Sequence, residues 1–315
     1  MNNLLNAIFS VEFLHSIIRV TTPLLFAALA ALVCNRGGVL HIAFEGSMLT
    51  AAFCGVVGSA YSQNLFVGLL AGLIGGIGIM MLLGYFNLVL HANVVLTGIA
   101  LNTFASGGTV FMLYVLCNDK GLSTSLNSLT FPKVDIPLLK SVPVLGTILS
   151  GHNILTYLSF LFVILVWMLV FKTPLGLRIR TVGENPNAAA SVGISVIKTK
   201  FITLAIAGFI ASLGGIYMSM GYLSWFARDM IAGRGFMGIA AQNLGGAAPL
   251  PTFLAALAFG VANALSNVLQ TLNVPAEAVQ VIPYVATLIG LIAYSSSQKR
   301  KKARRLQTVR NDKAT

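Results

Sequence analysis

Residues 173–200, TPLGLRIRTVGENPNAAASVGISVIKTK, form the longest polar interruption between strongly apolar segments of the chain. Asn185 is a residue type that caps helix N-termini, and Pro186 suits the first helical position, where its missing N–H costs nothing. Gly193 can adopt the left-handed conformation that ends a helix. The pattern predicts a helix of about two turns over residues 186–192, in a loop between two membrane spans.

Three consecutive alanines, Ala188, Ala189 and Ala190, keep this predicted helix slim. Because small side chains let another backbone approach closely, a capped helix of this kind suits docking into a groove of a partner protein. An ordinary loop on the cytoplasmic side of the membrane is the alternative. The residues of the loop do not decide between the two.

The composition places the chain in a lipid bilayer. Hydrophobic residues make up 57% of the 315 residues and charged residues 9%, whereas soluble domains carry about 25% charged residues. Apolar runs close to the ~20 residues that cross a bilayer recur along the whole length. We therefore expect an all-α fold, a polytopic transmembrane helical bundle. Its single transmembrane domain covers residues 1–298, and the N-terminus lacks the basic run of a cleavable signal peptide.

The positive charge of the chain lies beside the membrane spans. The net charge is +12, and residues 299–315 hold eight of the twenty Lys and Arg, while residues 172–200 hold five more. The positive-inside rule explains both groups as cytoplasmic anchors, and anionic lipid at that face adds to the attraction. We therefore expect a basic cytoplasmic tail over residues 299–315, the lipid bilayer as a partner, and no nucleic acid.

The apolar segments predict about nine passages through the bilayer, within a range of about 8–10. The expected segments are 14–34, 39–60, 65–90, one that follows Asn93 and ends near residue 117, 154–171, 201–220, 229–244, 252–272 and 279–294. The short, glycine-interrupted segment 229–244 is included because the basic tail would otherwise lie outside. Loop 118–151 has few basic residues for its length, so we expect it outside, and loop 173–200 inside.

A weak similarity between two stretches of the chain predicts an inverted repeat. Residues 36–45, RGGVLHIAFE, resemble residues 234–242, RGFMGIAAQ, with one gap. The two stretches follow the first and the sixth predicted spans, and an odd offset inverts one repeat relative to the other. Inverted repeats with glycine-broken helices are typical of transporters, whose substrate path lies at their interface. A chance match of small and apolar residues is the alternative.

Few polar side chains are expected inside the membrane, and these are candidates for a substrate pathway. The candidates are Glu45, Asn93, Asn102, Gln242 and Asn243, with the aromatic Phe104. An ionisable group within a span is costly and suggests function. Glu45 can instead pair with Arg36 or with a helix N-terminus, and the amides can join helices, where such bonds contribute about 0.6 kcal/mol.

Sequence patterns of catalysis are missing. The chain contains neither GxxxxGK[ST] nor HExxH, so we expect no ATPase or metalloprotease activity and no catalytic residue. Its histidines and cysteines lack the spacing of metal ligands, so no metal and no cofactor are expected on this chain.

The sequence resembles the permease subunits of ABC importers in the family that serves branched-chain amino acids, ribose and other simple sugars, and nucleosides. The resemblance covers residues 14–296 and rests on three stretches. They are RGGVLHIAFEG at 36–46, GLRIRTVGENP at 176–186 with its continuation to Gly193, and GRGFMGIAA at 233–241. The second stretch is closest to the nucleoside and simple-sugar branch. Val94, Gln242 and Asn243 depart from the usual pattern of that branch.

The resemblance implies a multi-pass permease of the bacterial cytoplasmic membrane that imports nucleosides. Simple sugars are the alternative substrate, and an ion-coupled secondary transporter is the alternative class. It further implies ABC ATP-binding subunits that carry ATP and Mg²⁺, a second permease subunit, and an extracytoplasmic substrate-binding lipoprotein. Loop 173–200 would couple to the ATPase. Docking is expected at Glu184, Asn185, Pro186, Ala189 and Gly193, with Arg178 and Arg180 at the rim.

Overall fold

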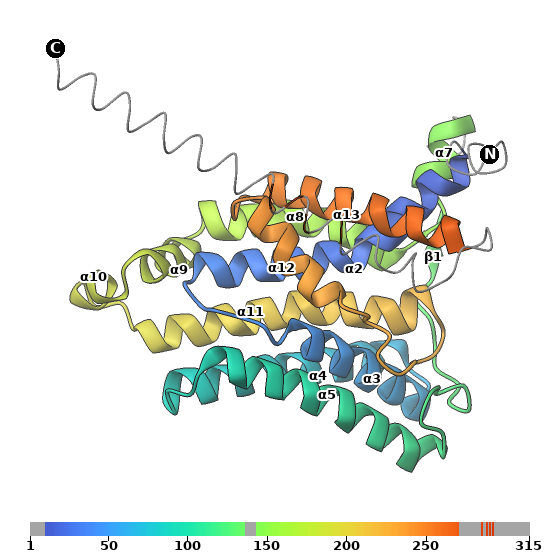
Figure 1. The fold of residues 1–315 in the computed structure, drawn as a ribbon, viewed down its shortest axis with the longest axis horizontal. Helices are drawn as coiled ribbons and strands as arrows, with labels where there is room; N and C mark the ends of the chain where they lie inside the picture. Colours follow the sequence, from blue (N-terminus) through green and yellow to red (C-terminus); the bar gives the residue numbers. More distant parts are fainter. Residues whose placement is uncertain are drawn as a thin grey trace.

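A computed structural model describes residues 10–135, 143–270 and the single positions 285, 288, 290 and 292; side chains of 143–145 are outside the description. The predicted passage 279–294, apart from those positions, and the tail 299–315 lie outside the described residues. Figure 1 shows a bundle of long helices that lie roughly side by side.

The membrane-length elements follow the predicted order. They are α2 (Val11–Arg36), α3 (Phe44–Ser62), α4 (Leu65–Gly84) with the π-helical turn η1 (Tyr85–Val89), α5 (Val94–Cys117), α8 (Ile154–Lys172), α11 (Val196–Tyr217) with η2 (Met218–Tyr222), and α13 (Pro249–Gln270). In the described part of the chain, six helices are long and apolar enough to cross a membrane, and α3 and the short α12 are not among them. The all-α polytopic prediction is confirmed.

Side-chain caps fix where several of these helices begin. The Asn64 side chain accepts from the backbone N–H of Phe66 at the start of α4, and the Asn93 side chain accepts from Val95 and Leu96 at the start of α5. Asn153 caps α8 in the same way. Each cap satisfies backbone donors that a helix end leaves without partners.

The core forms around α2, which packs against α11, α12, α13 and α8. Its residues 24–34 are fully buried. Glycines let α4 approach its neighbours, because a Cβ on Gly72 would lie 2.7 Å from the Ile216 side chain of α11 and 2.8 Å from the Ala51 carbonyl of α3. By contrast, most of α5 is exposed on the surface of the chain.

Two passages through the bundle are broken. After α2 ends, residues 37–43 run back without regular structure, and α3 begins only at Phe44. After η2, residues 223–233 run irregularly to α12 (Arg234–Leu244). Figure 1 shows that α3 and α12 both begin inside the bundle, away from its two ends.

The predicted short, glycine-interrupted passage 229–244 is helical only from Arg234 to Leu244. The 11 residues of α12 reach about 16 Å, roughly half of the ~30 Å hydrocarbon core, so the irregular segment before α12 makes up the rest of the passage. Likewise, the first five residues of the predicted span 39–60 belong to the irregular segment 37–43 and not to a helix.

The two long loops lie at opposite ends of the bundle (Figure 1). Loop 173–200 holds two helices where one was predicted, α9 (Pro174–Glu184) and α10 (Pro186–Ser191). Loop 118–151 contains β1 (Lys133–Val134) and α7 (Pro143–Leu149), and β1 pairs antiparallel with β2 (His152–Asn153). We call the two ends the α10 end and the α7 end.

Candidate functional site

The N-termini of α3 and α12 meet within the bundle. The Glu45 carboxylate, in the first turn of α3, accepts hydrogen bonds from the backbone N–H groups of Gly233 (2.7 Å) and Gly235 (2.9 Å) at the start of α12. Gly233 has a left-handed φ of 79°. A Cβ on Gly235 would lie 2.6 Å from the Glu45 nitrogen, so only glycine allows this contact.

Asn102, on α5, hydrogen-bonds to the backbone on both sides of the start of α3. Its Nδ2 donates to the Ile42 carbonyl (2.9 Å), and its Oδ1 accepts from the Gly46 N–H (2.8 Å). One amide thus satisfies a free carbonyl before α3 and a free N–H within its first turn. We call residues 42–46, Asn102 and residues 233–235 the helix junction.

The helix junction brings a negative charge to positive ends of helix dipoles. Each helix N-terminus carries about half a positive charge, and the Glu45 carboxylate lies against that of α12. Arg36 does not pair with Glu45. Its Nε donates to the Ala247 carbonyl at 2.8 Å, and its guanidinium lies over the Phe171 ring at 5.3 Å. Of the two structural alternatives for Glu45, the contact with a helix N-terminus is the one that occurs.

The structure brings only two of the six predicted pathway residues together, Glu45 and Asn102. Asn93 caps α5 at the α10 end, about 13 Å along the helix from Asn102 at 1.5 Å per residue. Phe104 is 64% exposed and lines an apolar groove with Leu82 and Phe86.

The remaining two predicted pathway residues lie near the end of α12. Gln242 is 2% exposed, and its Oε1 has no hydrogen-bond partner among the described residues. Asn243 is exposed one residue before the last of α12. Neither hydrogen-bonds to the helix junction in the described structure, so these two residues stay pathway candidates at a separate place on α12.

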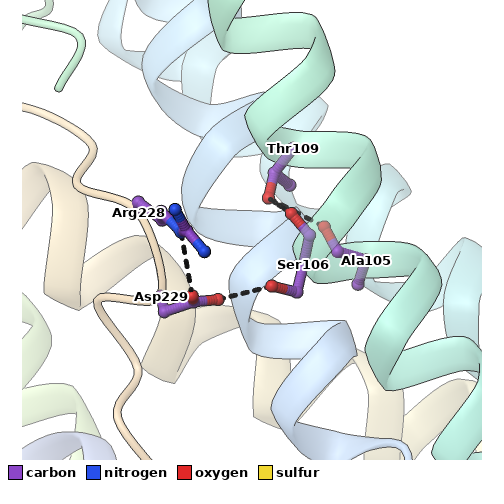
Figure 2. Close-up of polar contacts among 5 residues, drawn as sticks. All are labelled: Ala105, Ser106, Thr109, Arg228 and Asp229. Atoms are coloured by element: carbon purple, nitrogen blue, oxygen red, sulfur yellow. Dashed lines mark hydrogen bonds and ion pairs between the residues drawn. The ribbon is translucent and has the colours of Figure 1, made fainter. Parts of the chain in front are cut away.

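The sequence prediction missed a polar cluster beside the helix junction. The Ser106 hydroxyl, on α5, donates to Oδ1 of Asp229 (2.6 Å), and Nε of Arg228 donates to Oδ2 of Asp229 (3.4 Å), as Figure 2 shows. We call these three residues the Asp229 cluster. Asp229 stands at the first position of the segment predicted as 229–244, and an acidic residue there was a signal that could have pointed to the cluster.

The helix α10 begins as the sequence predicted. The Asn185 side chain accepts from the N–H groups of Asn187 and Ala188 at 3.1 Å each, Pro186 occupies the first position, and Gly193 is left-handed with φ 83°. The helix ends at Ser191, one residue earlier than predicted.

The proposed docking residues divide into exposed and buried ones. Glu184, Asn185, Pro186 and Gly193 are exposed, and an apolar side chain between them, Val192, is 72% exposed. Ala189 is fully buried. A buried methyl group positions the helix within the chain and offers no surface to a partner.

The two arginines of the predicted rim differ in the same way. Arg178 is exposed, whereas the Arg180 guanidinium lies over the Phe171 ring at 5.3 Å, beside that of Arg36. Arg180 therefore packs α9 onto the end of α8, and Arg178 remains the exposed member of the pair.

A backbone contact joins α9 to the first broken passage. A Cβ on Gly183 would overlap the carbonyl oxygen of Arg36, and a Cβ on Gly38 would lie 2.8 Å from the Gly183 Cα. The last turn of α9 thus rests directly on the start of the segment 37–43, which leads to the helix junction.

No metal site is found within residues 10–135 and 143–270, where no three His, Cys, Asp or Glu side chains are grouped to hold an ion.

Comparison with known proteins assigns the chain to a family of transport proteins. The model of a family described as "Branched-chain amino acid transport system / permease component" matches residues 13–291. The guanosine ABC transporter permease protein NupQ of Bacillus subtilis (strain 168) is 33% identical over 284 residues, 86% of this chain and 88% of NupQ. The nucleoside ABC transporter permease protein NupC of Lactococcus lactis subsp. cremoris (strain MG1363) is 30% identical over 285 residues, 87% of this chain and 89% of NupC.

A solved structure shares the fold. A chain of PsaBC from Streptococcus pneumoniae, in complex with Fab, aligns with a TM-score of 0.50 at 12% sequence identity, over 92% of this chain and 94% of that one. At this identity the likeness concerns the arrangement of helices alone.

Proposed function

Because this chain belongs to the family of permease components of branched-chain amino acid transport systems, we propose that it is the membrane-spanning subunit of an ATP-driven importer of nucleosides. It is a multi-pass membrane protein and a transport component, not an enzyme. The observation that carries the substrate class is the similarity to NupQ and NupC along most of the chain.

The paired broken passages support transport through this chain. Helices that begin inside a bundle point their N-terminal dipoles at its midplane, where transporters of several kinds handle their substrates. In the described structure, α3 and α12 begin there from opposite directions, and Glu45 links them. This arrangement agrees with the inverted repeat that the sequence predicts.

The proposal includes the partners of an ABC importer. ATP-binding subunits, which carry ATP and Mg²⁺, dock at the α10 end, which is therefore cytoplasmic, together with the tail 299–315. The exposed surface of α10 with Glu184, Asn185, Pro186, Val192 and Gly193 is the docking surface, with Arg178 at its rim. A second permease subunit completes the pathway, and an extracytoplasmic binding lipoprotein delivers the solute at the α7 end of the bacterial cytoplasmic membrane.

The contacts within the chain suggest how movement reaches the pathway. A displacement of α10 moves α9, whose Gly183 contacts the backbone of Arg36 and Gly38. Residues 37–43 carry the movement to the helix junction, where Glu45 and Asn102 hold the starts of α3 and α12. Packed contacts, hydrogen bonds and rigid helices are the physical links through which two sites in a protein can be coupled.

The test is uptake of labelled guanosine, uridine and ribose by cells with and without this gene, each measured with and without an uncoupler while ATP is maintained. We expect nucleoside uptake to depend on the gene and to survive the uncoupler. Loss of ribose uptake alone would move the substrate to simple sugars. Uptake that stops with the gradient would replace the ABC importer with a secondary carrier.

A further inference from the structure

Charged side chains of the Asp229 cluster are exposed at the middle depth of a membrane span. Ser106 lies about 18 Å along α5 from Val94 and about 17 Å from Cys117, at 1.5 Å per residue. Its partner Asp229 is 52% exposed and Arg228 63% exposed in their side chains. A carboxylate and a guanidinium at this depth cannot face hydrocarbon without a large cost, so such groups face water or protein.

A contact with loop 118–151 helps to place this cluster. The Arg228 N–H donates to the Gly121 carbonyl at 2.8 Å. The irregular segment 223–233 leads along α5 from the α7 end to the helix junction, where Gly233 bonds to Glu45. The cluster therefore lies next to the junction, and the side chains of Arg228 and Asp229 are each more than half exposed.

The opposite side of α5 at the same depth is apolar. Phe104 precedes Ser106 by two residues, which places it about 160° away around the helix at 100° per residue. It lines the groove with Leu82 and Phe86, and its ring suits contact with lipid. The adjacent Gly107 and Gly108, nearer to Phe104 than to Ser106 around the helix, have open space beside them. At this depth α5 thus presents an uncovered apolar side and a polar side on which Ser106 is half-buried beside Asp229.

We propose that the Asp229 cluster forms part of the wall of the aqueous translocation pathway and hydrogen-bonds a neutral, hydroxyl-bearing solute as it passes. The identity of the solute rests on the proposed function, whereas the exposure of the cluster to water does not depend on it. The Asp229 carboxylate has acceptor sites beyond those that Ser106 and Arg228 occupy, and the Arg228 guanidinium has five N–H donors. Because the pair is charge-balanced, it favours neutral solutes such as sugars and nucleosides over ions.

Exposure to water is tested by labelling single cysteines. Ser106→Cys and Phe104→Cys are made in a background in which Cys34, Cys54 and Cys117 are replaced by alanine, and the full transporter is treated in membranes with a membrane-impermeant, charged thiol reagent. We expect Ser106→Cys to react and its matched control, Phe104→Cys, to remain unmodified. Lack of reaction at Ser106→Cys, or reaction no faster than at Phe104→Cys, would overturn the pathway assignment.

Contact with the solute is tested by protection and by uptake. Excess guanosine or ribose should slow the labelling of Ser106→Cys, and whichever solute protects identifies the source of the hydroxyl groups. We expect Asp229→Asn to raise the KM of uptake about tenfold, because loss of a hydrogen bond to a charged group has an effect of that order. Unchanged KM and no protection by either solute would refute the solute contact. Should the wild type take up neither solute, the proposed function fails, while the labelling result still decides the pathway assignment.

Discussion

Replacing Gly183 by alanine perturbs a place where α9 rests directly on the broken passage. The added Cβ would overlap the Arg36 carbonyl oxygen and lie 2.9 Å from the Gly38 nitrogen. Both neighbours are backbone atoms, so no side chain can rotate away, and α9 must lift from the turn. Overpacking of this kind costs about 1–3 kcal/mol, against about 1 kcal/mol gained from better helix propensity. We expect a net destabilisation of about 0–2 kcal/mol.

The functional effect should exceed the effect on stability. A lifted α9 no longer presses on residues 37–43, so movement at α10 fails to reach the helix junction. We expect Gly183→Ala to retain assembly with ATP-binding subunits and ATP hydrolysis in proteoliposomes, but to lose most solute uptake. Thermal unfolding of the purified complex gives the stability change on the same samples.

The matched control is Gly78→Ala on α4, where an added Cβ meets no atom within 4 Å. It makes the same chemical change in a helix without a contact to disturb. If Gly183→Ala and Gly78→Ala transport equally well per ATP hydrolysed, the Gly183–Gly38 contact does not transmit the movement and the coupling route is wrong.

Three further variants test separate parts of the structure. Asn102→Ala should lower the unfolding midpoint, because each buried backbone group left unpaired costs about 1–3 kcal/mol. Asn102→Asp keeps the acceptor for Gly46 but sets a carboxylate oxygen against the Ile42 carbonyl and near the Glu45 carboxylate, so it should lower the midpoint at least as much, and an unchanged midpoint would contradict the bond to Ile42. Asn185→Ala removes a helix cap that contributes about 1 kcal/mol and should weaken copurification with ATP-binding subunits while the unfolding midpoint of the chain stays nearly constant. Burial lowers the pKa of His152 to about 4 from its usual 6.5, so the folded state binds fewer protons than the unfolded state between these values. Stability of the α7 end should therefore be constant above pH 6.5 and fall as the pH drops towards 4, and a His152→Asn variant with the same pH dependence of unfolding would contradict this assignment.

The sequence predicted the long helices well because their signals are local. Runs of apolar residues fix the spans, and asparagines at 64, 93 and 153 cap three helices through their own backbone neighbours. The start of α10 at Asn185 and Pro186 is of the same kind. The helix α9 was missed although Thr173 and Pro174 repeat this signature, with the Thr173 hydroxyl accepting from the Gly176 N–H at 3.0 Å.

The candidate site was predicted less well because it depends on contacts between distant segments. In the sequence, Asn93 and Asn102 are both amides of one apolar stretch. In the structure, Asn93 caps its own helix, whereas Asn102 hydrogen-bonds to residues more than fifty positions away. Residues 39–43 are apolar enough to begin a helix, as predicted, and the bonds of Asn102 to Ile42 and Gly46 help to hold the irregular form found instead. The side of α5 that Ser106 occupies follows from tertiary packing, which no local pattern contains.

Glu45 joins the two broken passages, through which the proposed transport would take place. Two charge-assisted hydrogen bonds from Gly233 and Gly235, each contributing about 1.5–3 kcal/mol, hold the start of α12 to the start of α3. A carboxylate suits a contact that has to open. If α12 moved away, the N–H groups of α12 and the Glu45 charge would be exposed together, and water in an open pathway would readily solvate both. An apolar contact of equal strength would instead lose its stabilisation to water. A polar link therefore makes opening depend on hydration of the pathway, and under the proposed function the energy for that step is supplied by ATP-binding subunits at the α10 end.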